Sequence, residues 1–314
     1  GAGEKLGKVL ENVEFHKPVI PYAANVTAQY VTEAQPVKDL LVKQVSSSVK
    51  WQQCVETMLA DGVDTFIEIG PGSGALTHPM AHLGRAITAV EVDAKLAAKI
   101  TQETSSAAVE VVHDDFLNFR LPATPCVIVG NIPFHLTTAI LRKLLHAPAW
   151  TDAVLLMQWE VARRRAGVGA STMMTAQWSP WFTFHLGSRV PRTAFRPQPN
   201  VDGGILVIRR VGDPKIPIEQ RKAFQAMVHT VFTARGRGIG EILRRAGLFS
   251  SRSETQSWLR SRGIDPATLP PRLHTNDWID LFQVTGSSLP HHRPISPSGS
   301  SQRPPQRKNR SRRR

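Results

Sequence analysis

Residues 127–134 place a carboxamide, a proline and an aromatic ring directly after an apolar run of buried-strand character. The side-chain oxygen of Asn131 can accept a hydrogen from an exocyclic amine. Pro133 has no N–H and pushes Ile132 into an extended conformation, so we expect carbonyls of this loop to remain free as acceptors. Phe134 offers a flat face on which a planar base can stack.

Two acceptors in the plane of an amine, with an aromatic ring against the heterocycle, suit an adenine whose N6 receives a methyl group. The same residues also fit a plain strand followed by a Gly-Asn-Pro turn. The sequence on either side of this stretch decides between the two interpretations.

A glycine loop follows the strand pattern at residues 66–69. Gly70, Gly72 and Gly74 let the backbone approach a ligand closely, and a predicted helix over residues 75–83 adds partial positive charge at its N-terminus. The spacing is Gly-x-Gly-x-Gly rather than Gly-x-Gly-x-x-Gly, which weakens the alternative of a dinucleotide-binding fold.

Carboxylates follow the next two predicted strands. The strand at residues 86–90 leads into Glu91, where a carboxylate can bind two ribose hydroxyls. The strand at residues 109–112 precedes Asp115, which could accept from an adenine amino group. Each acid alone would more often be a surface residue or a helix cap. Together with the glycine loop, Glu91, Asp115 and Asn131 would line the carboxyl edge of an open α/β sheet, where ligands bind.

This pattern resembles the S-adenosylmethionine methyltransferases, and Gly-Asn-Ile-Pro-Phe at residues 130–134 resembles the rRNA adenine-N6 methyltransferases among them. The similarity runs from Glu68 to about Phe282. Its further motifs are Ala-Val-Leu-Leu-Met-Gln-Trp-Glu-Val-Ala (153–162), Pro-Arg-Thr-Ala-Phe-Arg-Pro-Gln-Pro-Asn-Val-Asp (191–202) and Val-Phe-Thr-Ala-Arg-Gly-Arg (231–237). The chain looks most like the Erm-type enzymes, which methylate 23S rRNA and confer macrolide–lincosamide–streptogramin B resistance.

The resemblance implies a role for each site residue. Glu91 would hold the ribose of S-adenosylmethionine, and Asp115 would hold its adenine. Asn131 and Phe134 would hold the target adenine, while Phe195 would stack on the extruded base from the other side. The implied cofactor set is Glu68, Gly70, Gly72, Gly74, Glu91, Asp115 and Asn131. No metal is needed, because the leaving group is already activated.

The resemblance also implies the architecture, which is α/β. We expect a Rossmann-like methyltransferase sheet, a small all-helical C-terminal domain and a disordered basic tail. The predicted domains are residues 1–64, 65–211, 212–285 and 286–314, with a linker at residues 212–217. The tail is dominated by Ser, Pro, Gly and Arg, which predicts disorder and sequence-independent affinity for RNA.

The net charge of the 314 residues is +14, and its distribution favours a nucleic acid as the partner. Residues 1–70 carry −3 and residues 285–314 carry +8, so the middle of the chain is also basic. The candidate phosphate contacts are Arg163, Arg164, Arg165, Arg235, Arg237, Arg244 and Arg245; for the first three, a solvated helix face is the alternative. An apolar stripe at helical spacing predicts the core of the helical domain: Phe224, Met227, Val228, Val231 and Phe232.

Cys54 and Cys126 form no metal or disulfide framework, which fits a reducing compartment. The sequence shows no signal peptide and no apolar run near 18 residues. We therefore expect a cytoplasmic monomer that methylates 23S rRNA before or during ribosome assembly, with S-adenosylmethionine and without membrane or metal. Two alternatives stay open: a non-catalytic rRNA-binding protein, and an enzyme that acts on small-subunit rRNA or DNA.

Residues 1–72 resemble another family, the C-terminal part of bacterial malonyl-CoA:acyl-carrier-protein transacylases. Shared motifs are Pro-Val-Ile-Pro (18–21), Leu-Val-Lys-Gln-Val (41–45) and Asp-Thr-Phe-Ile-Glu-Ile-Gly-Pro-Gly (64–72). Gln44 matches an active-site position, but that family's serine elbow is missing, so we expect a fragment without transacylase activity. Residues 1–62 also lack the Gln-Asn-Phe-Leu segment of the rRNA methyltransferases, which predicts weaker cofactor binding by about 1–3 kcal/mol.

Overall fold

The computed structural model describes residues 64–104 and 108–286, together with a few positions nearer the N-terminus (10, 11, 22–24, 29–31, 33, 37 and 39). Two short antiparallel strands, β1 (Tyr22–Ala24) and β2 (Gln29–Val31), lie among these positions. Outside the described residues lie the transacylase-like motifs at 18–21 and 41–45, Gln44, Cys54 and the basic tail beyond Gly286.

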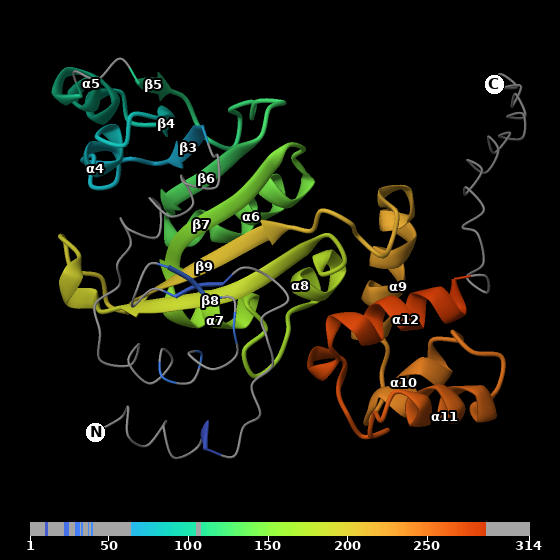
Figure 1. Ribbon diagram of the computed structural model, residues 1–314. Helices are drawn as coiled ribbons and strands as arrows, with labels where there is room; N and C mark the ends of the chain where they lie inside the picture. Colours follow the sequence, from blue (N-terminus) through green and yellow to red (C-terminus); the bar gives the residue numbers. More distant parts are fainter. Residues whose placement is uncertain are drawn as a thin grey trace, which may run out of the picture.

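A seven-stranded sheet in the order β5-β4-β3-β6-β7-β9-β8 organises the catalytic part of the chain (Figure 1). Strands β3 to β7 run parallel, and β9 runs antiparallel to both of its neighbours. The chain order changes direction between β3 and β6, which opens a crevice beside their carboxyl ends. The bounds are β3 (Thr65–Ile69), β4 (Ala86–Glu91), β5 (Val109–His113), β6 (Cys126–Asn131), β7 (Trp150–Gln158), β8 (Phe182–Val190) and β9 (Gly203–Arg210).

Helices flank the sheet and then form a segment of their own. Those of the sheet region are α4 (Thr77–Ala81), α5 (Ala94–Glu103), α6 (Thr137–His146), α7 (Trp159–Arg165) and α8 (Met173–Trp178). The C-terminal segment contains α9 (Arg221–Thr233), α10 (Ile239–Arg245), α11 (Arg252–Ser261) and α12 (Thr275–Thr285). Short 3-10 turns are η1 (Phe134–Leu136), η2 (Arg192–Ala194), η3 (Ile218–Gln220) and η4 (Pro270–Arg272). Helix α4 is shorter than the predicted 75–83, because turns occupy residues 72–76.

Both faces of the sheet are covered, because its central parallel strands are apolar on both sides. On one face, Phe66 and Val129 form a small buried cluster with Met80 of α4. On the other face, Ile67 and Ile128 belong to the main core, which also holds four apolar residues of α6: Ile140, Leu141, Leu144 and Leu145. The Rossmann-like α/β class expected from the sequence is confirmed.

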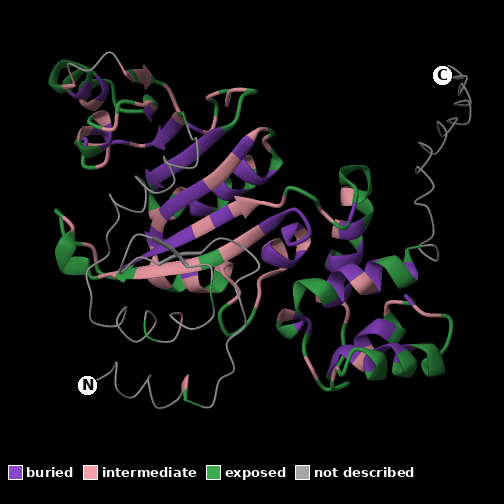
Figure 2. Ribbon diagram, viewed as in Figure 1, coloured by how far each residue is buried: buried purple, intermediate pink, exposed green. Residues whose placement is uncertain are grey.

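The main core continues from the sheet into the helical segment (Figure 2). Trp150 of β7 stacks on Phe182 of β8, with ring centroids 5.1 Å apart, and Phe182 meets Trp178 of α8 at 5.8 Å. Trp181 in turn meets Phe224 of α9 at 5.6 Å. The predicted stripe of α9 is confirmed as core, since its first four residues are buried and the fifth is partly buried.

The predicted linker at residues 212–217 is mostly exposed but is anchored at Ile216. Ile216 is only 1% exposed, and its carbonyl accepts a hydrogen bond from Trp181 Nε1 at 3.0 Å. This one residue therefore ties the connection to the shared core. None of the helices in the described ranges is long and apolar enough to cross a membrane.

Candidate functional site

The sheet topology brings the predicted cofactor residues to one edge. Strands β5, β4, β3 and β6 are adjacent and parallel, so their carboxyl ends lie side by side (Figure 1). Asp115, Glu91, the glycine loop and Asn131 follow these four ends in that order. A ligand along this edge would contact groups that are far apart in the sequence.

Glu91 is buried at the end of β4 and fixes the glycine loop. One of its carboxylate oxygens accepts the N–H of Gly72 at 2.9 Å, and the other accepts the N–H of Asp93 at 3.0 Å. A carboxylate has about four acceptor positions, so two remain for hydroxyl groups of a ligand. This arrangement fits a carboxylate that binds a ribose diol.

The glycine loop has backbone conformations that favour glycine. Gly70, Gly72 and Gly74 have φ values of +61°, +59° and +85°. A Cβ added to Gly70 or Gly72 would meet no atom within 4 Å, so open space lies beside the loop. A cofactor could therefore come close to the backbone here, as the resemblance to S-adenosylmethionine enzymes requires.

Glu68 lies behind this loop as a buried acid, 1% exposed. Burial raises its pKa to about 7, the hydroxyl of Thr77 that donates to it at 2.8 Å lowers the pKa, and the neighbouring charge of Glu91 raises it. A buried carboxyl with a strongly raised pKa at a ligand edge is typical of a functional site.

Asp115 lies in a loop that a lysine holds in place. Its Oδ1 accepts the N–H of Leu117 at 2.8 Å. Lys143 of α6 donates to the carbonyls of Phe116, at 2.5 Å, and of Phe119, and its ammonium lies 5.0 Å from the Phe116 ring centre. Sequence reasoning missed Lys143, whose only signal is a lysine between apolar residues of a helix. Lys143 connects the loop of Asp115 to α6.

Asn131 is exposed where β6 ends, which leaves its carboxamide available to a substrate. The carbonyls of Pro133 and Phe134 accept from the Leu136 N–H at 3.0 Å and the Thr137 hydroxyl at 3.0 Å. The expectation of free loop carbonyls is thus wrong for these two, because they help begin α6.

Ile132 keeps a carbonyl that no group in the described ranges engages, while its N–H donates to Leu156 at 3.0 Å. This carbonyl is the candidate second acceptor beside Asn131. Gly130 precedes them because a Cβ there would lie 2.8 Å from the carbonyl oxygen of Ile69 on β3. Close strand approach, rather than backbone freedom, requires this glycine.

Phe195 arrives at the same edge from the loop between β8 and β9. A Cβ added to Gly203 would lie 2.9 Å from the Phe195 ring and 3.0 Å from Leu156 Cδ1. The ring and the Leu156 side chain therefore both lie beside this glycine. Leu156 is the register partner of Asn131 on the neighbouring strand. The structure therefore places Phe195 about one strand away from Asn131, which the sequence alone does not show.

The three arginines of α7 have different surroundings. Arg163 pairs with Glu160 at 3.1 Å, and the partly buried Arg165 donates to the hydroxyls of Thr172 and Thr138. Burial and the nearby charges of other arginines lower the pKa of Arg165. Arg164 is exposed and has no acidic partner in the described ranges. It is the best placed of the three for a phosphate.

The arginines of the helical segment form an exposed group around α10. Arg235, Arg237 and Arg244 are exposed, as is Arg245, which pairs with Glu241 at 2.6 Å. A single acid therefore faces several guanidinium groups, and this surface suits a polyanion.

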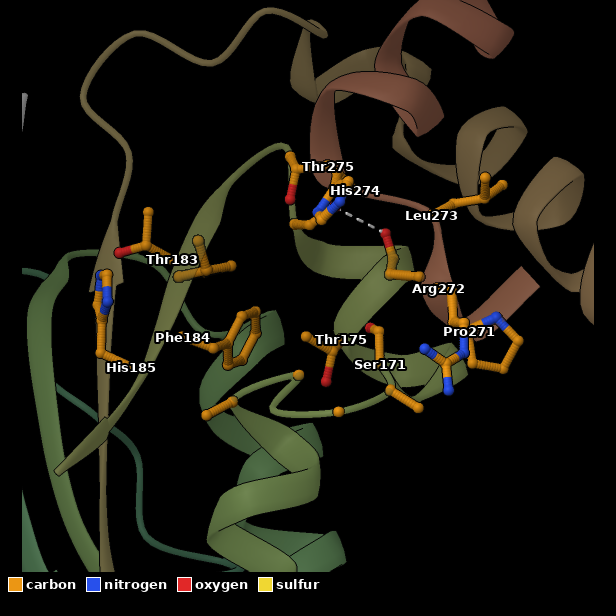
Figure 3. A pocket seen from close by; sticks show the side chains of 17 residues that line it. Ser171, Thr175, Thr183, Phe184, His185, Pro271, Arg272, Leu273, His274 and Thr275 are labelled. Carbon is orange, nitrogen blue, oxygen red and sulfur yellow. Dashed lines mark hydrogen bonds between the residues drawn. The ribbon is translucent and has the colours of Figure 1, made fainter. Parts of the chain in front are cut away.

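A cavity of about 580 Å³ lies away from these residues, between β8, the turn after α7 and the start of α12 (Figure 3). Figure 3 shows Phe184 and Thr175 on the side of the sheet and His274 on the side of the helical segment. None of the predicted catalytic or cofactor residues lines it. The predicted cofactor and substrate residues thus lie at the strand edge and not in this cavity.

Comparisons with known proteins agree with the geometry. The chain matches the family described as ribosomal RNA adenine dimethylase over residues 44–286. It is 98% identical over 183 residues to an rRNA adenine N-6-methyltransferase of Corynebacterium diphtheriae, covering 58% of this chain and 72% of that protein. It is 41% identical over 218 residues to the mycinamicin-resistance protein MyrB of Micromonospora griseorubida, covering 69% of each chain.

Solved structures show the same similarity. The crystal structure of the 23S rRNA methyltransferase ErmE aligns with 71% of this chain and 91% of its own, with a TM-score of 0.66 and 30% identity. A dimethyladenosine transferase from Plasmodium falciparum, at 19% identity and a TM-score of 0.55, shares the fold. The family match begins at residue 44, inside the segment that we predicted to be transacylase-like.

Proposed function

Because the chain belongs to the ribosomal RNA adenine dimethylase family, we propose that it transfers a methyl group from S-adenosylmethionine to N6 of an adenine in 23S rRNA, and thereby confers macrolide–lincosamide–streptogramin B resistance. The observation that carries this proposal is the alignment of Asp115, Glu91, the glycine loop and Asn131 along one sheet edge, with Phe195 one strand further on. The names of MyrB and ErmE support the resistance phenotype and the choice of 23S rRNA.

S-adenosylmethionine supplies a methyl group already activated by its sulfonium. Glu91 would bind the ribose hydroxyls, and Asp115 would accept from the adenine amino group of the cofactor. Glu68 is buried behind the glycine loop, and its ionisation state would determine the negative charge at this end of the site. These three carboxylates and the glycine loop therefore bind and orient, and they do not enter the chemical step.

The target adenine would leave the RNA stack and enter beside Asn131. The Asn131 oxygen and the Ile132 carbonyl would each accept one hydrogen of the amine. The two acceptors would stabilise the positive charge that grows on nitrogen during in-line transfer, so positioning and electrostatics supply the catalysis. Phe134 and Phe195 would hold the ring between them, and the proton would leave to water after transfer.

Tritium transfer from labelled S-adenosylmethionine to purified 23S rRNA tests the proposal. We expect label in 23S rRNA at one adenine, recovered as N6-methyladenine or N6,N6-dimethyladenine. Label in small-subunit rRNA or DNA would assign a different substrate. No transfer to any of these substrates, with RNA binding retained, would make the chain a non-catalytic rRNA-binding protein.

Several finer expectations belong to the same proposal. The chain would act as a monomer, since one copy carries both the cofactor edge and the basic helical segment.

Residues 65–211 and 212–285 would be the catalytic and RNA-binding domains, although they share one core. The transacylase origin of residues 1–64 rests on the sequence motifs alone, and the family match overlaps this segment from residue 44 onward.

A further inference from the structure

The loop that carries Phe195 is fixed at its base by one acid. Asp202 Oδ2 accepts from Arg189 Nε at 2.7 Å, and its Oδ1 accepts the backbone N–H of Arg192 at 2.8 Å. The carbonyl of Asp202 accepts the N–H of Trp159, and the Arg189 guanidinium lies 5.6 Å from the Trp159 ring centre. Both ends of the loop are thus tied to the start of α7, beside the catalytic edge.

Two further arginines of this loop are exposed and have no assigned role. Arg192 precedes Phe195 by three residues in η2, and Arg196 follows it directly. In the described ranges, neither guanidinium makes a hydrogen bond or ion pair. The acid of the loop, Asp202, is already bound to Arg189. The ring predicted to stack on the target base therefore lies between two exposed guanidinium groups. Of these, Arg192 is near enough to Asp202 to interact with its charge, and that carboxylate is shared with Arg189.

We infer that Arg192 and Arg196 bind the two phosphates on either side of the extruded adenosine. The inference rests on the proposed function and names how this site holds its RNA. When a nucleotide turns out of the stack, its base and its two flanking phosphates approach the protein together. A ring with a guanidinium on each side along the chain matches that arrangement, and arginine is the residue best suited to a phosphate.

Such contacts position the RNA backbone and do not read its sequence. The anchored loop would then present three groups to one nucleotide: the Phe195 ring to the base, and Arg192 and Arg196 to its phosphates. Removing either guanidinium should weaken RNA binding equally for different hairpin sequences and lower the slope of log affinity against log salt by about one.

The test uses the full chain and a synthetic hairpin that contains the adenine mapped in 23S rRNA. The variants are Arg192→Gln and Arg196→Gln, with Arg85→Gln as the matched control. Arg85 is a half-buried arginine that precedes β4 at the opposite edge of the sheet and pairs with Asp64. We expect each loop variant to bind the hairpin about tenfold more weakly, and the control to bind normally. All three should bind S-adenosylmethionine like the parent protein, which shows that they are folded.

Hairpins with one neutral methylphosphonate, placed 5′ or 3′ of the target adenosine, then identify the contact. With the parent protein, each substitution should cost about tenfold in affinity. With the variant that lacks the partner guanidinium, the matching substitution should cost less than twofold, because the contact is already gone. Additive losses for every pair would overturn the inference.

The result is separable from the proposed function. If the parent protein methylates the hairpin but the two loop variants bind and react normally, only the phosphate assignment fails. If the parent protein transfers no methyl group to any RNA, the proposed function itself fails, and binding by the variants then shows whether the loop contacts RNA in another role.

Discussion

The groups at the carboxyl edge of the sheet differ in exposure, and exposure decides what each can do. Asn131 is exposed and free to meet a substrate. Glu91 is 5% exposed and accepts two backbone hydrogen bonds, so it is fixed in place, which suits the proposed role of a binding group. Glu68 is almost fully buried beside another acid, which makes its ionisation costly. On the proposed function, catalysis, binding and charge control would thus be divided among neighbouring residues.

Replacing Asn131 by alanine should lower methyl transfer by about 10²–10³-fold, the typical cost of losing one acceptor aimed at developing charge. Binding of RNA and of S-adenosylmethionine should persist, because the side chain is exposed and supports no other residue in the described ranges. Single-turnover kinetics with prebound cofactor measure the effect. Near-normal turnover would show that Asn131 does not orient the amine.

Glu68 should make stability depend on pH. The carboxyl ionises near 4.5 when unfolded and near 7 when folded, so the folded state holds the extra proton between these values. The free energy of unfolding should therefore fall as pH rises from about 4.5 to about 7, by about 3 kcal/mol in total. Glu68→Gln keeps an acceptor for Thr77 and removes this loss.

Urea unfolding of both proteins without cofactor tests the effect of Glu68. The advantage of Glu68→Gln over the parent protein should be small at pH 5 and reach about 3 kcal/mol by pH 8. A difference that does not change with pH would mean that Glu68 titrates near its ordinary pKa.

At the scale of elements, the site depends on loops that helices and strands hold from behind. Lys143 of α6 holds the loop of Asp115, and Asp202 at the start of β9 holds the loop of Phe195. Neither residue is predicted to touch the reacting atoms. Both act through the position of another side chain.

Lys143→Met should weaken S-adenosylmethionine binding by about tenfold, because two hydrogen bonds from a charged donor to the loop carbonyls are lost. The rate at saturating cofactor should stay near that of the parent enzyme, since the amine site is separate. Titration calorimetry and steady-state kinetics measure the two effects. Arg142→Met, at the adjacent exposed position, is the control and should bind cofactor normally. A fall in kcat with unchanged cofactor affinity would place Lys143 in another role.

At the scale of the whole molecule, the catalytic sheet and the helical segment share one core. The aromatic series from Trp150 through Trp181 to Phe224 and Phe282 leaves no break where two domains could separate easily. The basic helical surface is therefore held in a fixed relation to the cofactor edge, which suits a single RNA lying across both.

Phe224→Ala should cost about 3–5 kcal/mol, the typical loss for a buried phenylalanine. Sheet and helical segment should still unfold in one transition, because they share this core. Tryptophan fluorescence and far-UV circular dichroism during urea unfolding would then give coincident curves. Val284→Ala, at a residue 52% exposed on α12, is the control and should change stability little. Two separated transitions would contradict the shared core.

Deleting residues 286–314 should weaken RNA binding without changing which adenine is modified. Eight positive charges in residues 285–314 would act through counterion release, so the shortened protein should show a shallower dependence of log affinity on log salt. Affinity measured at several salt concentrations, with the modified position mapped for both proteins, tests this. Identical salt slopes would show that the tail does not touch RNA.

Local patterns in the sequence determined the elements and the order of groups along the edge. Strand periodicity, the glycine spacing and the apolar stripe of α9 depend on near neighbours in the chain, so they predicted β3, β4, β6 and the helical segment correctly. The carboxyl ends of parallel strands lie at the same edge of a sheet. The sequence alone therefore predicted that Glu91, Asp115 and Asn131 lie together.

Only the tertiary structure decided which partners the long side chains contact and where loops distant in the sequence lie. Lys143 and Arg165 carry flexible side chains whose partners lie on other elements, so sequence spacing could not show that one fixes a loop and the other joins helices. The Phe195 ring lies beside Gly203 of β9 and Leu156, the register partner of Asn131, because β9 runs back beside β7. Such long-range contacts depend on the packing of the whole sheet, and for that physical reason the local sequence does not contain them.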